Sequence, residues 1–236
     1  MISIIIPTLN EEVYLPRLLK SIKRQDFLDY EIIVSDGGSS DSTGSIAREF
    51  DCSFVVDNEH RHPAWQRNNG AAVAQGELLL FLDADTILQE HFLIAAVNEF
   101  KIKNLGGAAF YVRFNPNRFI YSIYSLTINT VAYLRQFYSP IGIGAGILVS
   151  REKHNSIRGF DTSLFLAEDY DYCKRLSEIG KFKMIKSIKL LYSSRRLEKD
   201  GKYITLFKWL KIGFYSLLNI KIKKKIVNYD FGRFQK

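Results

Sequence analysis

The chain has 236 residues, of which 47% are hydrophobic and 25% are charged. This composition allows a sizeable core and excludes a disordered or collagen-like chain. Thirty-three basic and 25 acidic residues give a net charge of +8. That balance suits an anionic partner, such as a nucleotide phosphate, an acidic membrane surface or a nucleic acid, and does not choose among them.

Two cysteines, Cys52 and Cys173, provide neither a disulfide framework nor a zinc-ligand set. The first residues, MISIIIPTLNEE, lack the basic leader and long apolar run of a signal peptide. No segment reaches the roughly 18 apolar residues that a membrane span needs. We therefore expect a cytoplasmic protein.

The first half of the chain alternates short apolar runs with amphipathic stretches. Continuous apolar strands indicate a parallel sheet that is covered on both faces, and strand–helix alternation predicts a doubly wound α/β fold. The predicted strands are Ser3–Pro7, Glu31–Ser35, Ser53–Val56 and Leu78–Leu82, and the predicted helices include Leu15–Arg24, Ser42–Phe50 and Pro63–Gln75.

The second half is less regular. We predict strands at Gly106–Val112 and Ile143–Ser150, a helix at Phe119–Gln136, a helix that opens near Glu168, and a hairpin or two short strands at Phe182–Ile185 and Lys189–Tyr192. The chain then divides into one domain over residues 1–201 and a basic amphipathic C-terminal appendage over residues 202–236.

Polar residues gather where three of the predicted strands end. PTLNEE follows the first strand, DGGSSDST the second and DADT the fourth. Ligands of open α/β sheets bind outside the carboxyl ends of the strands, so these segments predict a site. Neither the dinucleotide fingerprint nor the phosphate-binding P-loop occurs after the first strand.

Asp83 and Asp85 end an apolar strand with one residue between them. This spacing points both carboxylates to the same side of a strand. An ionised carboxylate beside a core is costly unless it is paired or binds a metal. The pair suits Mg²⁺ or Mn²⁺, and such a cation could neutralise a leaving diphosphate. The alternative is a solvated turn in which Asp85 and Thr86 begin a helix.

Four segments together resemble the family 2 glycosyltransferases of the GT-A fold, over roughly residues 2–201. They are SIIIPTLNEE, VSDGGSSDST, QRNNGAAVAQGELLLFLDADT and GFDTSLFLAEDYDYCKRL. The resemblance implies a Rossmann-like, mostly parallel central sheet flanked by helices. It implies a donor-binding part over about residues 1–115 and an acceptor-side part over about 116–201. The implied reaction is an inverting transfer from a nucleoside-diphosphate sugar, most often a UDP-sugar, to an acceptor hydroxyl or phosphate.

The resemblance also implies roles for individual residues. Asp169 in the pair Glu168-Asp169 matches the catalytic base, Asp85 a ligand of the divalent cation, and Asp83 a residue on the ribose or metal side. The implied nucleotide-sugar-binding residues are Pro7, Thr8, Asn10, Glu11, Asp36, Gly38, Ser39, Arg67, Asn68, Asp83, Ala84 and Asp85. The same Glu168-Asp169 pair would also complement a helix dipole, and both roles are compatible.

The segment after the acidic helix departs from the family pattern. Many members carry a histidine there as a further metal ligand, whereas this chain reads LLYSSRRLEKDGKY. Arg195 and Arg196 are candidates for contact with the donor diphosphate or an acceptor phosphate. The alternative is two solvated arginines on a surface loop.

The tail places Leu206, Leu210, Phe214, Leu217 and Leu218 at helical spacing among lysines. Such a helix either lies on a membrane surface or packs its apolar stripe on the domain. The uncharged segment Phe119–Leu134 is a second candidate for a membrane or lipid contact. We therefore expect a glycan or lipid-linked acceptor, a role in cell-envelope glycan synthesis and peripheral contact with the inner face of the membrane.

Three other functions compete with the transferase. One is a catalytically silent sugar-nucleotide-binding or scaffold protein of the same fold. Another is a nucleic-acid binder, which is disfavoured because acidic strand ends repel phosphate unless a cation intervenes. The third is a nucleotidyltransferase, which is disfavoured because PTLNEE stands where its glycine-rich phosphate loop would follow the first strand.

Overall fold

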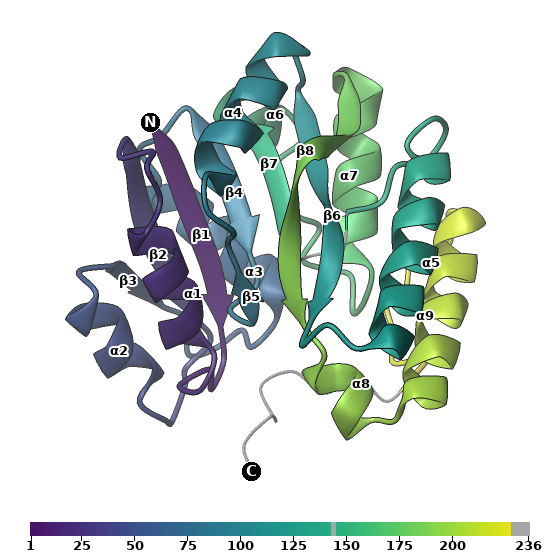
Figure 1. Ribbon diagram of the computed structural model, residues 1–236, viewed down its shortest axis with the longest axis horizontal. Helices are drawn as coiled ribbons and strands as arrows, with labels where there is room; N and C mark the ends of the chain where they lie inside the picture. The colour runs from purple at the N-terminus through teal and green to yellow at the C-terminus, as the bar shows by residue number, and fades with distance from the viewer. Residues whose placement is uncertain (143–144, 228–236) are drawn as a thin grey trace.

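The computed structural model describes residues 1–142 and 145–227. A single eight-stranded sheet forms its centre, with helices on both faces (Figure 1). The strands are β1 (Ile2–Thr8), β2 (Tyr30–Asp36), β3 (Ser53–Val56), β4 (Leu78–Leu82), β5 (Thr86–Ile87), β6 (Gly107–Asn115), β7 (Gly146–Ser150) and β8 (Phe182–Ser193).

The sheet has the strand order β3-β2-β1-β4-β7-β6-β8-β5. The first four strands in this order are parallel, as the apolar runs predict. β7 is antiparallel to both of its neighbours, β6 and β8 are parallel, and the short β5 pairs antiparallel with β8. The carboxyl ends of β1, β2 and β4 therefore meet along one edge.

Helices cover both faces because successive residues of a strand point to opposite sides. Along β1, Ile4 and Ile6 pack into one core cluster and Ile5 into the other. The first cluster includes residues of α1 (Leu15–Lys23), α2 (Thr43–Glu49) and α4 (Phe92–Ile102). The second includes residues of α3 (Pro63–Val73), α5 (Phe119–Arg135) and α7 (Glu168–Ile179).

All four predicted strands of the first half are confirmed to within two residues at each end. The prediction of two short strands at Phe182–Ile185 and Lys189–Tyr192 is wrong, because β8 is one strand with an irregularity opposite Phe110 and Tyr111. This irregularity inserts Lys186, Ser187 and Ile188, and the two polar residues interrupt the apolar pattern without ending the strand. The start of the predicted strand at Ile143 lies outside the described residues.

Several elements escaped prediction from the sequence. They are β5, α4, α6 (Arg151–Ser156) and the short α8 (Arg195–Lys199). The last helix, α9 (Lys202–Leu217), lies beside α5 on the right of Figure 1. Trp209 of α9 stacks on Phe114 and packs edge-on against Tyr124 of α5, with ring centroids 6.3 and 6.5 Å away. The division into a domain and an appendage at residue 201 stays a prediction.

The predicted apolar stripe of α9 is only partly turned inward. Thr205 and Ile212 are buried, and Leu206 and Trp209 pack against the core. Leu210, Phe214, Leu217 and Leu218 are each at least half exposed. The helix thus packs on the domain through one face and carries apolar side chains on another.

Candidate active site

One cavity of about 550 Å³ begins at the carboxyl ends of β1 and β4 and continues between α5 and α9. Its polar end contains many of the side chains that the motifs predict. The predicted residues that line it are Pro7, Glu11, Arg67, Asp83, Ala84, Asp85, Glu168, Asp169, Arg195 and Arg196.

Asp83 and Asp85 follow β4 directly, where the buried strand ends. The alternative in which Asp85 and Thr86 begin a helix is wrong, because Thr86 begins β5 and pairs with Tyr192 of β8. The Thr86 amide and hydroxyl both donate to the Asp83 carbonyl, at 3.1 and 2.8 Å. This turn holds the two carboxylates at the polar end of the cavity.

Arg67, near the start of α3, binds two acidic residues from separate elements. Its Nη2 donates to Asp83 Oδ1 at 2.9 Å and its Nη1 to Glu168 Oε1 at 2.8 Å. The guanidinium is buried and also lies over the ring of Phe160. Burial alone would raise the pKa of Glu168, but the charge and hydrogen bond of Arg67, the charge of His62 and a backbone hydrogen bond together outweigh burial and lower that pKa. Arg67 therefore keeps Glu168 ionised and fixes it against the end of β4.

Arg195, the first residue of α8, lies between Glu11 and Asp85. Its Nη1 and Nη2 donate to the two carboxylate oxygens of Glu11 at 2.7 and 2.9 Å, and its Nε lies 2.7 Å from Asp85 Oδ2. The same guanidinium lies over the ring of Tyr14. The expectation of two solvated arginines is wrong for Arg195, whose side chain is 11% exposed.

The carboxylates around Arg195 carry more negative charge than one guanidinium neutralises. Burial raises the pKa of Glu11 to about 7 even though Arg195 lowers it. Burial also raises the pKa of Asp85 against the effect of Arg195, and the nearby Asp83 adds to the rise. A buried cluster with excess negative charge and oxygen ligands fits a hard divalent cation.

The protein supplies only part of a metal shell. No group of three His, Cys, Asp or Glu side chains is arranged to hold a metal within residues 1–142 and 145–227. A cation at Asp85 would therefore take further ligands from a bound diphosphate and from water, as Mg²⁺ commonly does. The segment after the acidic helix, which lacks a histidine, brings Arg195 to the carboxylates of Glu11 and Asp85.

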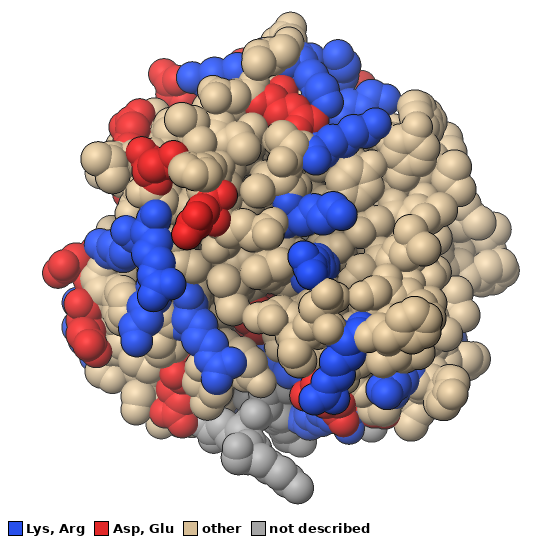
Figure 2. Space-filling view, viewed as in Figure 1, with Lys and Arg blue, Asp and Glu red and all other residues tan. Residues whose placement is uncertain are grey.

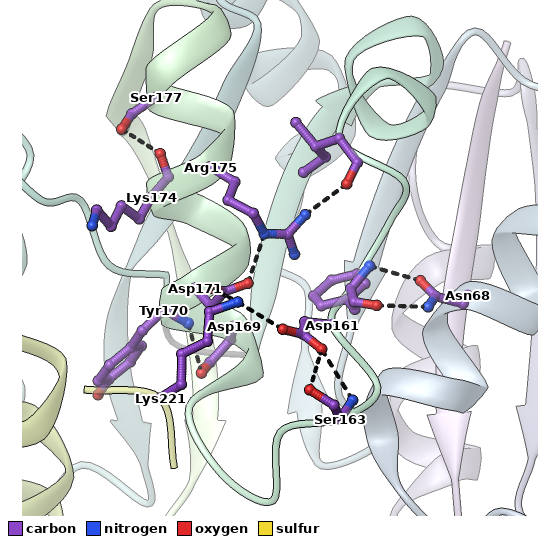
Figure 3. Close-up of polar contacts among 12 residues, drawn as sticks. Asn68, Asp161, Ser163, Asp169, Tyr170, Asp171, Lys174, Arg175, Ser177 and Lys221 are labelled. Carbon is purple, nitrogen blue, oxygen red and sulfur yellow. Dashed lines mark hydrogen bonds and ion pairs between the residues drawn. The ribbon is translucent and has the colours of Figure 1, made fainter. Parts of the chain in front are cut away.

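Glu168 and Asp169 form the first turn of α7, as predicted. The residue before them, Ala167, has a left-handed backbone with φ of 63°, which costs an L-residue roughly 1–2 kcal/mol. Asp169 is half-buried, and its Oδ1 accepts a hydrogen bond of 2.9 Å from the Tyr170 amide (Figure 3). The strained residue and the helix together fix the direction in which the acidic pair enters the cavity.

Packing behind α7 fixes its position. Tyr172 stacks on Phe160 with ring centroids 3.8 Å apart, and its hydroxyl is 2.7 Å from Nδ1 of His154. Phe81 of β4 meets both aromatic rings edge-on. Because β4 carries the aspartates and α7 carries the acidic pair, this aromatic cluster sets the distance between them.

The loops after β1 and β2 bind each other, and the predicted residues Thr8, Asn10, Asp36, Gly38 and Ser39 lie outside the cavity lining. Asp36 accepts hydrogen bonds from the Thr8 hydroxyl at 2.9 Å and from the Ser39 amide and hydroxyl at 2.7 and 2.6 Å. The Asn10 amide donates to Ser39 Oγ at 2.7 Å. Gly38 has φ of 78°, and a Cβ there would lie 2.8 Å from Asn58 Oδ1. The roles of these residues in nucleotide binding stay predictions.

Asn68 also lies outside the cavity lining. Its side-chain amide both donates to the Phe160 carbonyl and accepts from the Phe160 amide, each at 2.9 Å (Figure 3). This pair of bonds tethers the loop before α7 to α3. Its predicted contact with the nucleotide is not tested by this arrangement.

Gln66 is a site residue that the motifs did not nominate. It lines the cavity, and its buried Nε2 has no hydrogen-bond partner among the described residues. Leaving such a donor unsatisfied costs about 1–3 kcal/mol, so a ligand that accepts from it would recover that energy. The feature of the sequence that could have identified Gln66 is its position directly before Arg67, in the first turn of α3.

The other end of the cavity is apolar, and the sequence did not predict it as one surface. Its walls are Ile128, Val131 and Leu134 of α5 and Leu210, Phe214 and Leu217 of α9. The sequence identified both helices as apolar, but not that they face each other. None of the described helices has the length and hydropathy that crossing a bilayer requires.

Curated relatives of the chain are glycosyltransferases. It is 42% identical over 90 residues to GalNAc(5)-diNAcBac-PP-undecaprenol beta-1,3-glucosyltransferase of Campylobacter jejuni, covering 36% of this chain and 29% of the relative. It is 32% identical over 176 residues to 4,4'-diaponeurosporenoate glycosyltransferase of Staphylococcus haemolyticus, covering 72% of this chain and 45% of the relative. The chain thus spans less than half of the length of each.

Solved structures show the same fold. The mannosyltransferase PcManGT of Pyrobaculum calidifontis, solved with GDP-Man and Mn²⁺, superposes with a TM-score of 0.70 at 20% identity, over 89% of this chain and 64% of that one. TarS 1–349 of S. aureus gives a TM-score of 0.69 at 18% identity, over 87% of this chain and 64% of that one. The predicted GT-A fold class is confirmed.

The family model for glycosyl transferase family 2 matches residues 3–161, which include the segments after β1, β2 and β4. The match covers more than half of the chain. The chain belongs to glycosyl transferase family 2.

Proposed function

We propose that this protein transfers a sugar from a nucleoside-diphosphate sugar to an acceptor hydroxyl or phosphate, with inversion at the anomeric carbon, and that the donor is a UDP-sugar, as the family resemblance implies. The observation that carries the proposal is the presence of Asp85 and Asp169 in the wall of one cavity. One carboxylate stands at the end of the central strand and the other on the first turn of α7, so donor and acceptor can meet between them.

Asp169 is the general base in this proposal. It takes the proton from the acceptor hydroxyl as that oxygen attacks the anomeric carbon, and the bond to the nucleoside diphosphate breaks in the same displacement. A single displacement inverts the anomeric centre. Glu168 is held by Arg67 at 2.8 Å and positions the start of α7.

Asp85, with Asp83 beside it, would hold Mn²⁺ or Mg²⁺. When bound, the cation would neutralise charge on the leaving diphosphate. Arg195 and Arg196 line the same part of the cavity and add positive charge for phosphate. The unsatisfied amide of Gln66 adds a hydrogen-bond donor for the nucleotide sugar.

The acceptor is proposed to be lipid-linked or an envelope glycan. The apolar end of the cavity supports a substrate with an apolar part. The name of the Campylobacter relative specifies an undecaprenol-linked substrate, which agrees with this class.

Nucleotide binding tests the proposal directly. We expect UDP to raise the melting temperature in the presence of Mn²⁺, more than GDP does, because the cation links the acidic cluster to the diphosphate. The Asp85→Asn variant should lose the metal-dependent part of the shift, whereas Asp171→Asn, a carboxylate outside the cavity lining, should keep it. Binding of UDP without hydrolysis or transfer of any UDP-sugar would favour the silent scaffold instead.

A membrane contact is proposed for the exposed apolar faces of α5 and α9. Phe119, Leu126, Phe207 and Leu210 are each more than 60% exposed. Figure 2 shows a broad uncharged surface on the side where these helices lie, with Lys and Arg side chains at its edges. Apolar and basic groups together favour an anionic bilayer.

Flotation with vesicles tests that contact. The protein should float with vesicles that contain anionic lipid at low salt and less so with neutral vesicles. Replacing Phe207 and Leu210 by Ser should reduce the bound fraction several-fold, and the matched change of exposed apolar residues on another face, Leu28→Ser and Ile102→Ser, should not. Failure to float with anionic vesicles at low salt would remove this part of the proposal.

A further inference from the structure

The cavity between α5 and α9 contains a buried cation. Arg135, in the last turn of α5, lines the cavity and is 5% exposed. Its Nε donates to the Ser139 carbonyl at 3.1 Å, and its Nη2 donates to the hydroxyls of Ser139 and Ser216 at 2.9 and 3.2 Å. These partners are neutral, and within residues 1–142 and 145–227 no carboxylate forms a salt bridge with Arg135.

A buried guanidinium without a counter-charge is costly for the free protein. Burial lowers the pKa of Arg135, against smaller opposing effects of Tyr170 and Tyr138. The buried arginines at the polar end, Arg67 and Arg195, each bind two carboxylates. Arg135 thus differs from them and is available to an anion from outside the chain.

The surroundings of Arg135 limit what that anion can be attached to. Two contacts tie α5 to α9 at separate points, where Tyr124 donates to the Lys202 carbonyl and Arg135 donates to Ser216. The stretch of α9 between these points is about 20 Å long, from a rise of about 1.5 Å per residue. Val131, Leu134, Leu210 and Phe214 line the cavity along this stretch and are also exposed, so the apolar part opens to the surface.

The polar end limits the other part of the ligand. Arg135 and Asp169 line the same continuous cavity, and Tyr170, beside Asp169, is close enough to act on the charge of Arg135. A molecule whose anion binds Arg135 and whose hydrocarbon part lies between the helices can therefore extend its other end toward Asp169.

We propose that this part of the cavity is the acceptor site for a phosphorylated lipid: the phosphate binds Arg135, the hydrocarbon chain lies in the apolar groove between α5 and α9, and the group attached to the other side of the phosphate carries the acceptor hydroxyl toward Asp169. The proposal rests on the glycosyltransferase function above and deepens it by assigning residues to the acceptor. Arginine suits this role because its planar guanidinium binds phosphate oxygens through paired hydrogen bonds. The serine hydroxyls hold the guanidinium in place and leave Nη1 outside these bonds.

The test uses Trp209, which lines the groove, as a fluorescent reporter. The chain has two tryptophans, so Trp65→Phe leaves Trp209 alone, and Trp65 does not line the cavity. In that background the probes are farnesyl phosphate, farnesol and inorganic phosphate. We expect farnesyl phosphate to change the emission of Trp209 and to bind at least about 10-fold more tightly than farnesol. Inorganic phosphate should bind too weakly to compete at millimolar concentration.

Substitutions test the binding of the lipid's phosphate group and of its hydrocarbon chain separately. Arg135→Gln should weaken the binding of farnesyl phosphate at least about 10-fold and leave the binding of farnesol unchanged. Arg135→Lys should recover part of the lost affinity. Leu210→Gln should weaken the binding of both farnesyl phosphate and farnesol. Arg17→Gln, an exposed arginine on α1, is the matched control and should change neither.

Two results would overturn the proposal. If Arg135→Gln binds farnesyl phosphate as tightly as its parent, the phosphate site is not at Arg135. If neither lipid changes the emission of Trp209, the groove does not bind the hydrocarbon chain of the lipid. Failure in this assay with intact binding of UDP and Mn²⁺ leaves the transferase proposal standing. Lipid binding without any nucleotide binding overturns the transferase proposal and the acceptor role with it, and leaves only a lipid-phosphate site at Arg135.

Discussion

Replacing Asp169 by Asn is expected to reduce kcat for sugar transfer by about 10² to 10⁴-fold, because the acceptor hydroxyl loses its general base. Donor binding should change little, since the proposed function places the nucleotide at the end of β4 and beside Glu11, away from Asp169. Asn keeps an oxygen that can accept the hydrogen bond from the Tyr170 amide, so the start of α7 should remain folded. Steady-state transfer assays and the melting temperature measure the two effects.

The matched control for this change is Asp171→Asn, on the same helix. Asp171 binds Arg175 at 2.6 Å and does not line the cavity. Its replacement should leave kcat within a few-fold of the parent. If Asp169→Asn keeps its full transfer rate, another group is the base and the assignment of α7 to the reaction is lost.

Replacing Arg67 by Met is expected to lower the free energy of unfolding by about 3 kcal/mol, because it leaves buried carboxylates without their cation. Glu168 has a side chain only 9% exposed, whereas Asp83 is 28% exposed and can recover part of its hydration. For a chain of this size the melting temperature should fall by roughly 6 to 12 °C. Urea and thermal unfolding both measure the loss.

Two further variants decide whether the loss comes from charge. Adding Glu168→Gln to Arg67→Met should restore part of the stability, because one unpaired carboxylate is removed. Arg48→Met, at an exposed position, should stay within about 0.5 kcal/mol of the parent. An Arg67→Met variant as stable as the parent would mean that Glu168 and Asp83 do not depend on the arginine.

The sequence predicted the parallel half of the fold well because its signals are local. β1, β2 and β4 are short apolar runs whose residues are mostly buried on both faces, and each ends in a polar segment. The second half was predicted less well because its signals are interrupted. β8 carries a bulge with exposed polar residues, and β5 has only two residues, so neither produces a clear pattern.

The sequence also nominated the acidic residues but not their partners. The motifs place Asp83, Asp85, Glu168 and Asp169 at the ends of elements, and the cavity brings them together. The bond between Arg195 and Glu11 joins residues 184 positions apart, and no local pattern encodes such a pair. The buried bonds of Asp36 with Thr8 and Ser39 likewise depend on the register of β1 against β2.

By itself the sequence determined the parallel half of the sheet, the family and the acidic strand ends, because apolar periodicity and short motifs are written in consecutive residues. Only the tertiary structure decided three other features: which guanidinium neutralises which carboxylate, that α5 and α9 face each other across an apolar groove, and that Arg135 lies there without a described counter-charge. These features depend on distances between segments far apart in the chain. Such distances are set by the packing of the whole core.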